Sequence, residues 1–463
     1  MIDLNKYSQF YFLGIGGIGM SALARFMAGQ GWLVSGYDRS SSKITQELQY
    51  ESINVNFTDS ADAIPENVKG NNRETLIIYT PAIPADNKQL QFFRNHNFAI
   101  YKRAEVLGTI TNTQENIAIG GTHGKTSTSW MMAHIMKQGG FNVFALLGGV
   151  SADYQTNYLA GKGLHESKFI IEADEYDRSF LQLSPDVEII TSAEADHLDI
   201  YGDHHHMLQA YQSFVDRVKA EGLILAYEGT EFNKPDHARR MYTYGYHPDS
   251  DFRAQNIRLS NGFYSFDFVS DDFVIKNIRL GVAGRHNILN SLPCIAVATI
   301  NYQINEDMIR ESLFSFSGVK RRMEFMIRNG KHIFIDDYAH HPTEIKATID
   351  TIKELYPLKK ITAVFQPHLY SRTRDFADEF ASVLSVVDHL VLLDIYPARE
   401  MPIKGITSKI IFDKVSTKRK YLLNAKELMT FLETDDNEII LTLGAGDIDM
   451  LIEPIKEVLA AKK

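Results

Sequence analysis

The stretch that decides the fold runs Asn116-Ile-Ala-Ile-Gly-Gly-Thr-His-Gly-Lys-Thr126, and the segment STSWMMAHIMKQ follows it to residue 138. Its apolar start predicts a buried strand, its glycines predict a tight turn, and its continuation predicts a helix. This order is typical of a phosphate-binding loop, because glycines let backbone N–H groups approach phosphate oxygens and a helix N-terminus carries positive potential. Lys125 can reach the β- and γ-phosphates of a nucleotide, and the Thr126 hydroxyl can hold Mg²⁺.

One position departs from the full phosphate-loop pattern. The pattern G-x-x-x-x-G-K-[ST] requires a glycine where this chain has Ile119. The alternative interpretation is a glycine-rich turn whose lysine is incidental. Because a strand and a helix flank the turn, we interpret it as a shorter variant of the phosphate loop.

Candidate metal-binding side chains follow two later apolar strands. Glu172 ends the strand KFIIE, and His197 follows the next strand within the segment EADHLD. The carboxyl ends of parallel strands are where α/β sheets bind their ligands. Phosphoryl transfer needs carboxylates there to hold one or two cations against a triphosphate. We therefore predict a Mg²⁺ site at Glu172, with His197 either as a further ligand or as a hydrogen-bonding partner, since Mg²⁺ prefers oxygen.

A second glycine-rich turn lies near the N-terminus, in FLGIGGIGMSALA. It contains G-x-G-x-x-G as Gly14, Gly16 and Gly19, and Asp38 ends the next predicted strand. Alone, this pattern predicts a dinucleotide site with Asp38 on a ribose, as in an NAD-dependent dehydrogenase. A substrate that carries a nucleotide diphosphate would use the same loop. Because the chain already has a separate triphosphate loop, we favour such a substrate.

The last third of the chain has polar turns after its predicted strands. The segment GVKRRMEF precedes its first strand, DDYAHHP follows that strand, and QPHLYSRTR follows the second. Arginines beyond strand ends suit a carboxylate, through paired hydrogen bonds. Three strand–turn–helix starts in series predict an α/β protein of three domains. We place these domains at 1–110, 111–316 and 317–463. The middle domain holds the phosphate loop, and its segment near 225–280 predicts added antiparallel strands.

The bulk composition narrows the class of protein. The chain has 463 residues and a formal net charge of −10, and its basic runs are short, so we expect no nucleic-acid partner. We expect no membrane span, because no apolar run approaches the roughly 20 residues that a bilayer requires. The single cysteine, Cys294, cannot form an intrachain disulfide and fits a reducing compartment. These features favour a cytoplasmic enzyme whose anionic substrates are bound by a few placed cations.

Twelve short motifs follow one another along the chain: FLGIGGIGMSALA, YTPAIP, KRAEVLG, GTHGKTSTS, EADEYDRSF, EADHLDIYGD, GRHNILNSL, GVKRRMEF, DDYAHHPTEI, FQPHLYSRTRDF, DIYPARE and LGAGDI. In this order they resemble the Mur ligase family over essentially the whole chain. The resemblance implies a Rossmann-like N-terminal domain, a central P-loop-type ATPase sheet with added antiparallel strands, and a Rossmann-like C-terminal domain. The resemblance implies ATP-dependent joining of L-alanine to the carboxylate of UDP-N-acetylmuramate, in peptidoglycan precursor synthesis. It implies that this carboxylate attacks the γ-phosphate of ATP and that the alanine amine attacks the resulting acyl phosphate.

The resemblance also implies site residues, motif by motif. For the UDP substrate these are Gly14, Ile15, Gly16, Gly17, Ile18, Gly19, Asp38, Thr80, Pro81, Ala82, His123 and Tyr338. For ATP they are Gly121, Thr122, His123, Gly124, Lys125, Thr126, Ser127, His286, Asn287, Arg322 and Asp337. The implied ligands of one or two Mg²⁺ ions, or of Mn²⁺, are Thr126, Glu172 and His197. The implied catalytic set is Lys125, Glu172, His197, His340 and Arg372.

One departure and two alternatives remain. Leu369 stands where the family often has arginine, so we expect the alanine carboxylate to bind Arg372 or Arg374. A recycling ligase, which attaches a murein tripeptide to the same sugar nucleotide, has close motifs. A non-catalytic nucleotide-binding module would not need the cluster at Glu172 and His197. For the assembly we expect a monomer or a weak homodimer.

Overall fold

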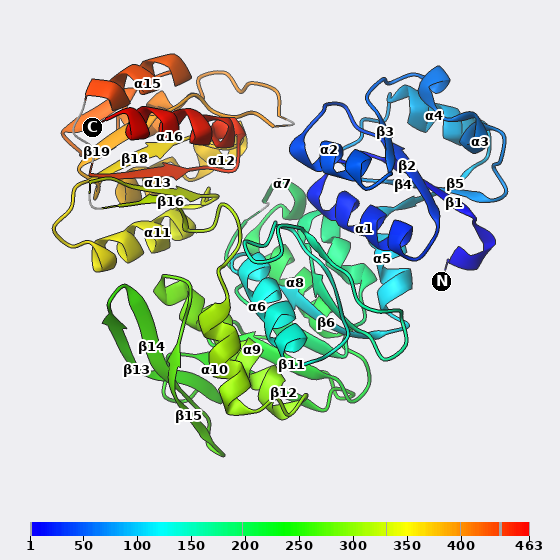
Figure 1. Cartoon of the computed structure of the whole chain (residues 1–463), viewed down its shortest axis with the longest axis horizontal. Coiled ribbons are helices and arrows are strands. Elements are labelled where there is room, and N and C mark those ends of the chain that lie inside the picture. The colour runs from blue at the N-terminus through cyan, green and yellow to red at the C-terminus, as the bar shows by residue number, and fades with distance from the viewer. Residues whose placement is uncertain (1, 197, 330, 399, 435–437, 463) are drawn as a thin grey trace. The chain divides into compact units, whose positions relative to one another are not determined.

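The computed structural model describes residues 2–196, 198–329, 331–398, 400–434 and 438–462. Its strands form three sheets, of five, ten and six strands. The chain, coloured from its N-terminus to its C-terminus in Figure 1, divides into two compact units. The first consists of Met1–Arg258, Ser265–Gly281 and Ile288–Ser317, and the second consists of Leu259–Tyr264, Val282–Asn287 and Gly318–Lys463. The three predicted α/β sheets are confirmed, whereas the predicted boundaries at 110 and 316 stay predictions.

The N-terminal sheet is wholly parallel, with the order β3-β2-β1-β4-β5. Its central strand has both faces buried, because Phe10 and Phe12 pack into one core cluster and Tyr11 and Leu13 pack into another. Parallel strands covered on both faces read as continuous apolar runs. The strands are β1 (Gln9–Leu13), β2 (Leu33–Tyr37), β3 (Asn54–Asn56), β4 (Thr75–Tyr79) and β5 (Ala99–Lys102), and the helices are α1 (Ile18–Gly29), α2 (Lys43–Tyr50), α3 (Glu66–Lys69), α4 (Lys88–Asn95) and α5 (Arg103–Thr111).

The central sheet has the order β15-β14-β13-β12-β11-β10-β6-β9-β7-β8. Its strands are β6 (Glu115–Gly120), β7 (Val143–Leu146), β8 (Tyr158–Leu159), β9 (Lys168–Glu172), β10 (Val187–Ile190), β11 (Leu223–Tyr227), β12 (Arg240–Gly245), β13 (Phe252–Ser260), β14 (Phe263–Val269) and β15 (Val274–Arg279). Its helices are α6 (Lys125–Gln138), α7 (Leu198–Tyr201), α8 (His204–Val215), α9 (Arg285–Ile300) and α10 (Glu306–Ser315).

The added antiparallel strands are confirmed for β14 and β15, which pair antiparallel. The expectation was wrong for the start of this region, since β12 pairs with β11 in parallel. The segment at 228–239 that joins these two strands is long enough for the crossover that a parallel pair requires.

The first unit has a shared core under its two sheets. Phe26 of α1 packs against Phe144 of β7 and Phe169 of β9, with ring centroids 5.5 and 5.8 Å apart. Asn116 of β6 is fully buried, and its side-chain amide donates to the carbonyl oxygen of Thr111 at the end of α5. Helix α1 is therefore packed directly on strands of the central sheet.

The C-terminal sheet lies wholly within the second unit and has the order β16-β17-β21-β18-β19-β20. All its strand pairs are parallel except β16 with β17. The strands are β16 (Glu324–Arg328), β17 (Ile333–Asp337), β18 (Ile361–Phe365), β19 (His389–Leu392), β20 (Arg419–Leu422) and β21 (Ile439–Leu443). The helices are α11 (Pro342–Leu355), α12 (Tyr370–Asp375), α13 (Ala377–Leu384), α14 (Lys409–Phe412), α15 (Ala425–Thr434) and α16 (Ile452–Ala461).

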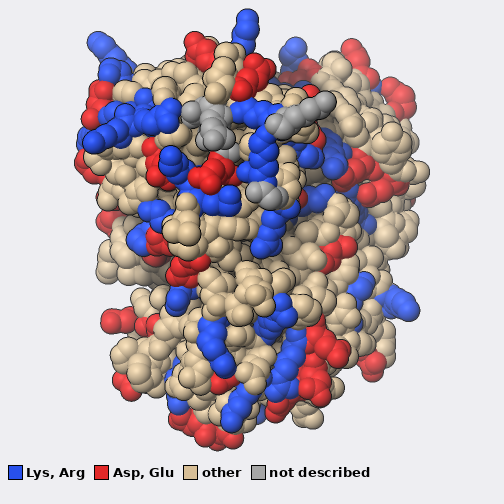
Figure 2. Space-filling view, turned by 60° about the vertical axis from the view of Figure 1, so that its left-hand side comes forward, with Lys and Arg blue, Asp and Glu red and all other residues tan. Residues whose placement is uncertain are grey.

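The surface carries charges of both signs. On the face drawn in Figure 2, the side chains of Lys and Arg are interspersed with those of Asp and Glu. Among the described residues, no helix is long and apolar enough to cross a membrane.

Candidate functional site

The phosphate-type loop lies between β6 and α6, as the sequence predicts. Gly121 and Gly124 have φ angles of +132° and +84°, which side-chain-bearing residues rarely adopt. A Cβ atom on Gly121 would lie 2.1 Å from the Thr191 hydroxyl oxygen. Both glycines are therefore required for the backbone to turn from the strand end into the first turn of a 14-residue helix.

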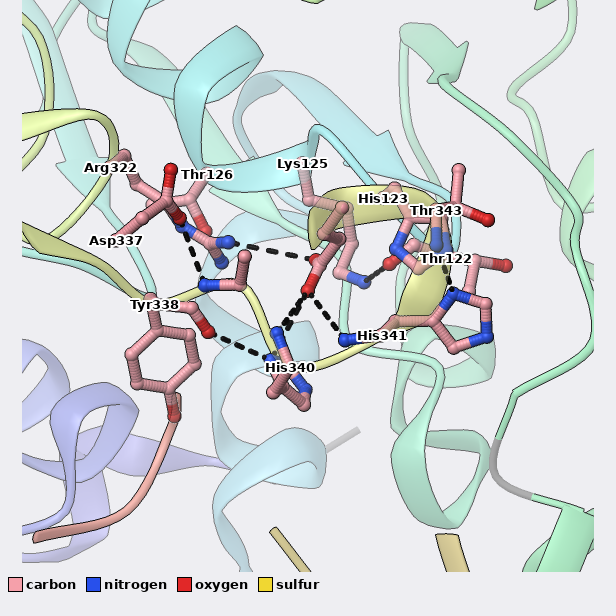
Figure 3. Close-up of polar contacts among 12 residues, drawn as sticks. Thr122, His123, Lys125, Thr126, Arg322, Asp337, Tyr338, His340, His341 and Thr343 are labelled. Atoms are coloured by element: carbon pink, nitrogen blue, oxygen red, sulfur yellow. Dashed lines mark hydrogen bonds and ion pairs between the residues drawn. The ribbon is translucent and has the colours of Figure 1, made fainter. Parts of the chain in front are cut away.

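Lys125 is held inside this loop by acceptors of the first unit, and Figure 3 draws its bond to Thr122. Its ammonium donates to the carbonyl oxygens of Gly121 and Thr122, at 2.5 and 3.2 Å, and to Glu175 Oε1 at 2.9 Å. Burial raises the pKa of the Glu175 carboxyl to about 7, although the Lys125 ammonium opposes the shift. Burial acts to lower the pKa of Lys125, but the carboxylates of Glu175, Glu172 and Asp174 together outweigh it and the pKa is raised. The lysine is thus a cation tethered where phosphate oxygens would compete for it.

Two hard oxygen donors meet beside the lysine. The Thr126 hydroxyl donates to Glu172 Oε1 at 2.9 Å, and the backbone N–H of Gly148 donates to Glu172 Oε2 at 2.8 Å. A hydroxyl and a carboxylate side by side are a donor set that fits Mg²⁺. His197, the other predicted ligand, lies outside the described residues.

The N-terminal glycine loop is tied to its own sheet. Gly16 donates its backbone N–H to Asp38 Oδ2 at 2.8 Å, and a Cβ atom on Gly16 would meet that oxygen at the same distance. Asp38 therefore holds the loop itself in this structure. The Ile15 side chain is fully buried in the core, which leaves its backbone as the part that could face a ligand. Gly17 precedes the first residue of α1, so the loop ends at a helix N-terminus.

A cavity of about 320 Å³ opens in the first unit between α1 and the end of β9. Of the predicted UDP-substrate residues, Gly17, Ile18, Gly19, Thr80 and Pro81 line it, and so does the predicted metal ligand Glu172. The remaining predicted UDP-substrate residues of this unit, Gly14, Ile15, Gly16, Asp38, Ala82 and His123, are not among its lining residues.

Two cations that we did not assign to the site, Lys102 and Arg103, also line this cavity. A Cβ atom on Gly19 would lie 3.0 Å from Arg103 Nη1, so the guanidinium packs against the first turn of α1. Arg103 Nη2 is 3.4 Å from Asp174 Oδ2, and Lys102 Nζ is 2.7 Å from Asp177 Oδ2. The motif KRAEVLG contained both residues, but only the fold places them beside the glycine loop.

In the second unit, polar side chains gather after β17 (Figure 3). His340 Nδ1 lies 3.2 Å from Glu344 Oε2, and Arg322 Nη1 lies 3.6 Å from Glu344 Oε1. The Arg322 guanidinium also stacks over the Tyr338 ring, 5.0 Å from its centroid. Asp337 is buried and accepts from the Ala339 N–H at 2.9 Å; burial raises the pKa of Asp337 to about 6 against the pull of Arg322. Four predicted residues of the C-terminal domain thus lie together: Arg322, Asp337, Tyr338 and His340.

The GRHN motif belongs to the second unit, together with Arg322. Burial lowers the pKa of His286 to about 4, and the positive charge of Arg322 lowers it further, so the imidazole is neutral near pH 7. Its Nδ1 atom is buried without a hydrogen-bond partner among the described residues. Asn287 donates its side-chain amide to the Ala283 carbonyl oxygen at 2.6 Å. The orphaned imidazole nitrogen fits a role in binding a heterocycle.

The two candidate arginines after β18 differ in their surroundings. Arg372 is buried, and its Nη1 is 3.5 Å from His368 Nδ1. The His368 ring packs edge-on to the ring of His340, with centroids 5.8 Å apart. Arg374 is exposed and paired with Asp375, Nε to Oδ1 at 2.6 Å. Leu369, the departure from the family pattern, is buried at a φ of +69°.

Comparisons with known proteins agree over the whole chain. Sequence profiles match at residues 9–115 (Mur ligase family, catalytic domain), 119–298 (Mur ligase middle domain) and 321–446 (Mur ligase, glutamate ligase domain). A UDP-N-acetylmuramate–L-alanine ligase from Christiangramia forsetii is 46% identical over 99% of both chains. The crystal structure of the UDP-N-acetylmuramate-alanine ligase from Thermotoga maritima has a TM-score of 0.83 and 27% identity, over 98% of this chain and 100% of that one. A murein peptide ligase from Psychrobacter arcticus has a TM-score of 0.70 and 20% identity, over 98% and 99% of the two chains.

Proposed function

Because the chain belongs to the Mur ligase family, we propose that it joins L-alanine to the carboxylate of UDP-N-acetylmuramate and converts ATP to ADP and phosphate. The Christiangramia forsetii relative, 46% identical over 99% of both chains, carries the name of this reaction. The likeness to the murein peptide ligase, at 20% identity, concerns the fold alone. The comparisons therefore favour L-alanine over a murein tripeptide as the second substrate.

The observation that carries the proposal is the cavity of the first unit. Gly17 and Gly19, at the start of α1, line the same cavity as Glu172. A diphosphate bound at the helix N-terminus would therefore extend its sugar toward the carboxylate that fits Mg²⁺. A ligase that activates a carboxylate with ATP needs this proximity, because the attacking oxygen must approach the γ-phosphate.

Each residue of the central loop has a role in this chemistry. With ATP bound, Lys125 would exchange its carbonyl acceptors for the β- and γ-phosphates, and Thr126 and Glu172 would hold Mg²⁺. The ion neutralises the charge of the triphosphate when bound. A muramate carboxylate oxygen forms a bond to the γ-phosphorus while the bond from that phosphorus to ADP breaks. The alanine amine then attacks the acyl carbon, loses a proton, and phosphate leaves.

The second unit supplies the remaining contacts in this proposal. His286 and Asn287 bind the adenine, and Arg322 binds phosphate oxygens of ATP. Arg372 binds the alanine carboxylate, because Arg374 is already paired with Asp375 at the surface. Tyr338 and His340 line the muramate and alanine end. Four expectations stay predictions: the number of metal ions, the use of Mn²⁺, assembly as a monomer or weak homodimer, and a cytoplasmic location.

The test is release of ADP and phosphate from ATP with Mg²⁺ and UDP-N-acetylmuramate, with L-alanine compared against L-Ala-γ-D-Glu-meso-diaminopimelate. We expect release that depends on L-alanine, with one amide bond formed per ADP. Release with the tripeptide alone would assign the protein to the recycling reaction. Release with neither amine would contradict the choice of sugar nucleotide as well.

Replacing Arg103 with alanine is expected to raise KM for UDP-N-acetylmuramate by about 10- to 100-fold, because a cation beside the diphosphate and the muramate carboxylate is lost. KM for ATP should change less than about twofold, since the phosphate loop keeps its own lysine. Initial rates at varied substrate concentrations measure both constants. Arg94→Ala, at an exposed arginine of α4, is the control and should behave as wild type. A larger effect on KM for ATP than on KM for the sugar nucleotide would place Arg103 elsewhere in the reaction.

A further inference from the structure

The loop between β7 and β8, residues 147–157, contacts both the candidate Mg²⁺ ligand Glu172 and the first turn of α1. At one end, the backbone N–H of Gly148 donates to Glu172 Oε2 at 2.8 Å. At the other end, the fully buried Asn157 donates its side-chain amide to the Ile18 carbonyl oxygen at 2.6 Å and to the Ser21 hydroxyl at 2.9 Å. The two ends are joined, because the Leu147 N–H donates to the Asn157 carbonyl oxygen at 3.1 Å.

The orientation of the Asn157 amide is set by a buried arginine. Arg25 of α1 donates from Nη1 to Asn157 Oδ1. Arg25 is itself held by Glu47 and Glu51 of the N-terminal domain, with nitrogen–oxygen distances of 3.1 and 2.9 Å. Because a guanidinium only donates, it directs the amide oxygen toward Arg25 and the amide nitrogen toward the Ile18 carbonyl oxygen. The Asn157 side chain thus accepts from the Arg25 guanidinium and donates to the Ile18 carbonyl oxygen, both of α1.

The first turn of α1, to which Asn157 donates, faces the cavity. Gly17, Ile18 and Gly19 line the cavity, and so do Gly148 and Glu172. A shift of this turn would move a bound diphosphate relative to the carboxylate that fits Mg²⁺. A displacement of about 1 Å can lower a rate by about 10²-fold when two reacting groups must meet in line.

We propose that Asn157 is a positioning residue, which holds the first turn of α1 in register with Glu172 so that the muramate carboxylate meets the γ-phosphate of ATP. This inference rests on the proposed function. Asn157 does not line the cavity, and it acts through Ile18 and through the loop that carries Gly148. We therefore expect a change at Asn157 to alter the rate of ADP formation at saturating substrate more than it alters the binding of ATP.

The test compares two variants that change the amide differently. Asn157→Ala removes all of its side-chain hydrogen bonds. Asn157→Asp keeps the acceptor for Arg25 and places a carboxylate oxygen against the Ile18 carbonyl oxygen, which repels it. For both variants we expect kcat for L-alanine-dependent ADP release to fall by about 10- to 100-fold, with KM for ATP within about twofold of wild type. Rates are divided by the concentration of nucleotide-binding sites, titrated with ADP, so that loss of folded protein does not count as loss of kcat.

The matched control is Asn142→Ala. Asn142 lies just before β7. Its side-chain amide donates to the Lys162 and Gly163 carbonyl oxygens and to the Ser167 hydroxyl, so, like Asn157, it holds a loop through side-chain hydrogen bonds. It does not line the cavity between α1 and β9, so kcat per site should stay at the wild-type value.

The outcomes separate the two proposals. If wild-type protein shows no L-alanine-dependent ADP release, the proposed function fails. If wild type is active and both Asn157 variants match its kcat per site, or lose no more than Asn142→Ala does, the positioning role is overturned. A loss confined to KM for ATP in the Asn157 variants would also overturn it.

Discussion

Replacing Lys125 with methionine is expected to lower kcat for L-alanine-dependent ADP release by about 10³-fold. The ammonium is the cation that the phosphate loop presents to the triphosphate, and charge stabilisation of this kind is a large part of phosphoryl-transfer catalysis. Methionine keeps an unbranched side chain of nearly the same length and removes its charge. The measurement is kcat at saturating ATP and UDP-N-acetylmuramate. The control is Lys137→Met in the last turn of the same helix, where the ammonium lies over the Tyr154 ring at 5.2 Å from its centroid. Activity of Lys125→Met within about tenfold of wild type would contradict the phosphate-loop assignment.

From the sequence alone Lys125 has no evident role in stability, but the structure pairs it with the buried Glu175 carboxyl. The folded-state pKa of Glu175, about 7, lies above its ordinary value, so the folded protein holds this proton more tightly than the unfolded chain does. This group therefore favours folding below the unfolded pKa, and that contribution is lost as pH rises toward 7. Without the Lys125 ammonium, the pKa of Glu175 rises further, so the loss of folding stability with rising pH continues to higher pH.

We accordingly expect the stability deficit of Lys125→Met to be larger at pH 8.5 than at pH 6, as measured by denaturant unfolding at both pH values. The double variant Lys125→Met with Glu175→Gln should lose this extra pH dependence, because glutamine has no proton to release. An equal deficit of Lys125→Met at both pH values would contradict the coupling of the two side chains.

Glu172→Gln is expected to lower kcat by about 10²-fold or more and to raise the half-saturating Mg²⁺ concentration by about tenfold or more. The amide retains an oxygen that can accept from the Thr126 hydroxyl and loses the negative charge that attracts the cation. Titration of the rate with Mg²⁺ separates the two effects, and high Mg²⁺ should restore part of the lost rate.

The matched control for this variant is Glu115→Gln. Glu115 is also a strand-end carboxylate, but it lies at the opposite end of neighbouring strands, in an ion pair with Lys168, where β6 and β9 begin. Its Mg²⁺ dependence should be that of wild type. The metal assignment would be wrong if Glu172→Gln and Glu115→Gln had the same half-saturating Mg²⁺ concentration.

The sequence by itself determined the phosphate loop and the three sheets, because their causes are local. The turn at 121–124 needs glycines at two positive φ angles, and a strand and a helix flank it within a few residues. Glu172 followed from a general rule, since it ends a parallel strand where α/β sheets bind ligands. The same local reasoning was wrong for β12, because whether a short strand pairs parallel or antiparallel depends on the route of its connection.

Only the tertiary structure decided which distant side chains share the site. Arg103 packs against Gly19, and Glu175 forms an ion pair with Lys125. Asn157 donates to the hydroxyl of Ser21 in α1, which lies 136 residues earlier in the chain. It also showed that Ile15 points into the core although its loop faces the site. These contacts join segments whose spacing follows no periodicity, so no sequence pattern encodes them. The contact of Asn157 also depends on how α1 packs on the central sheet through Phe26.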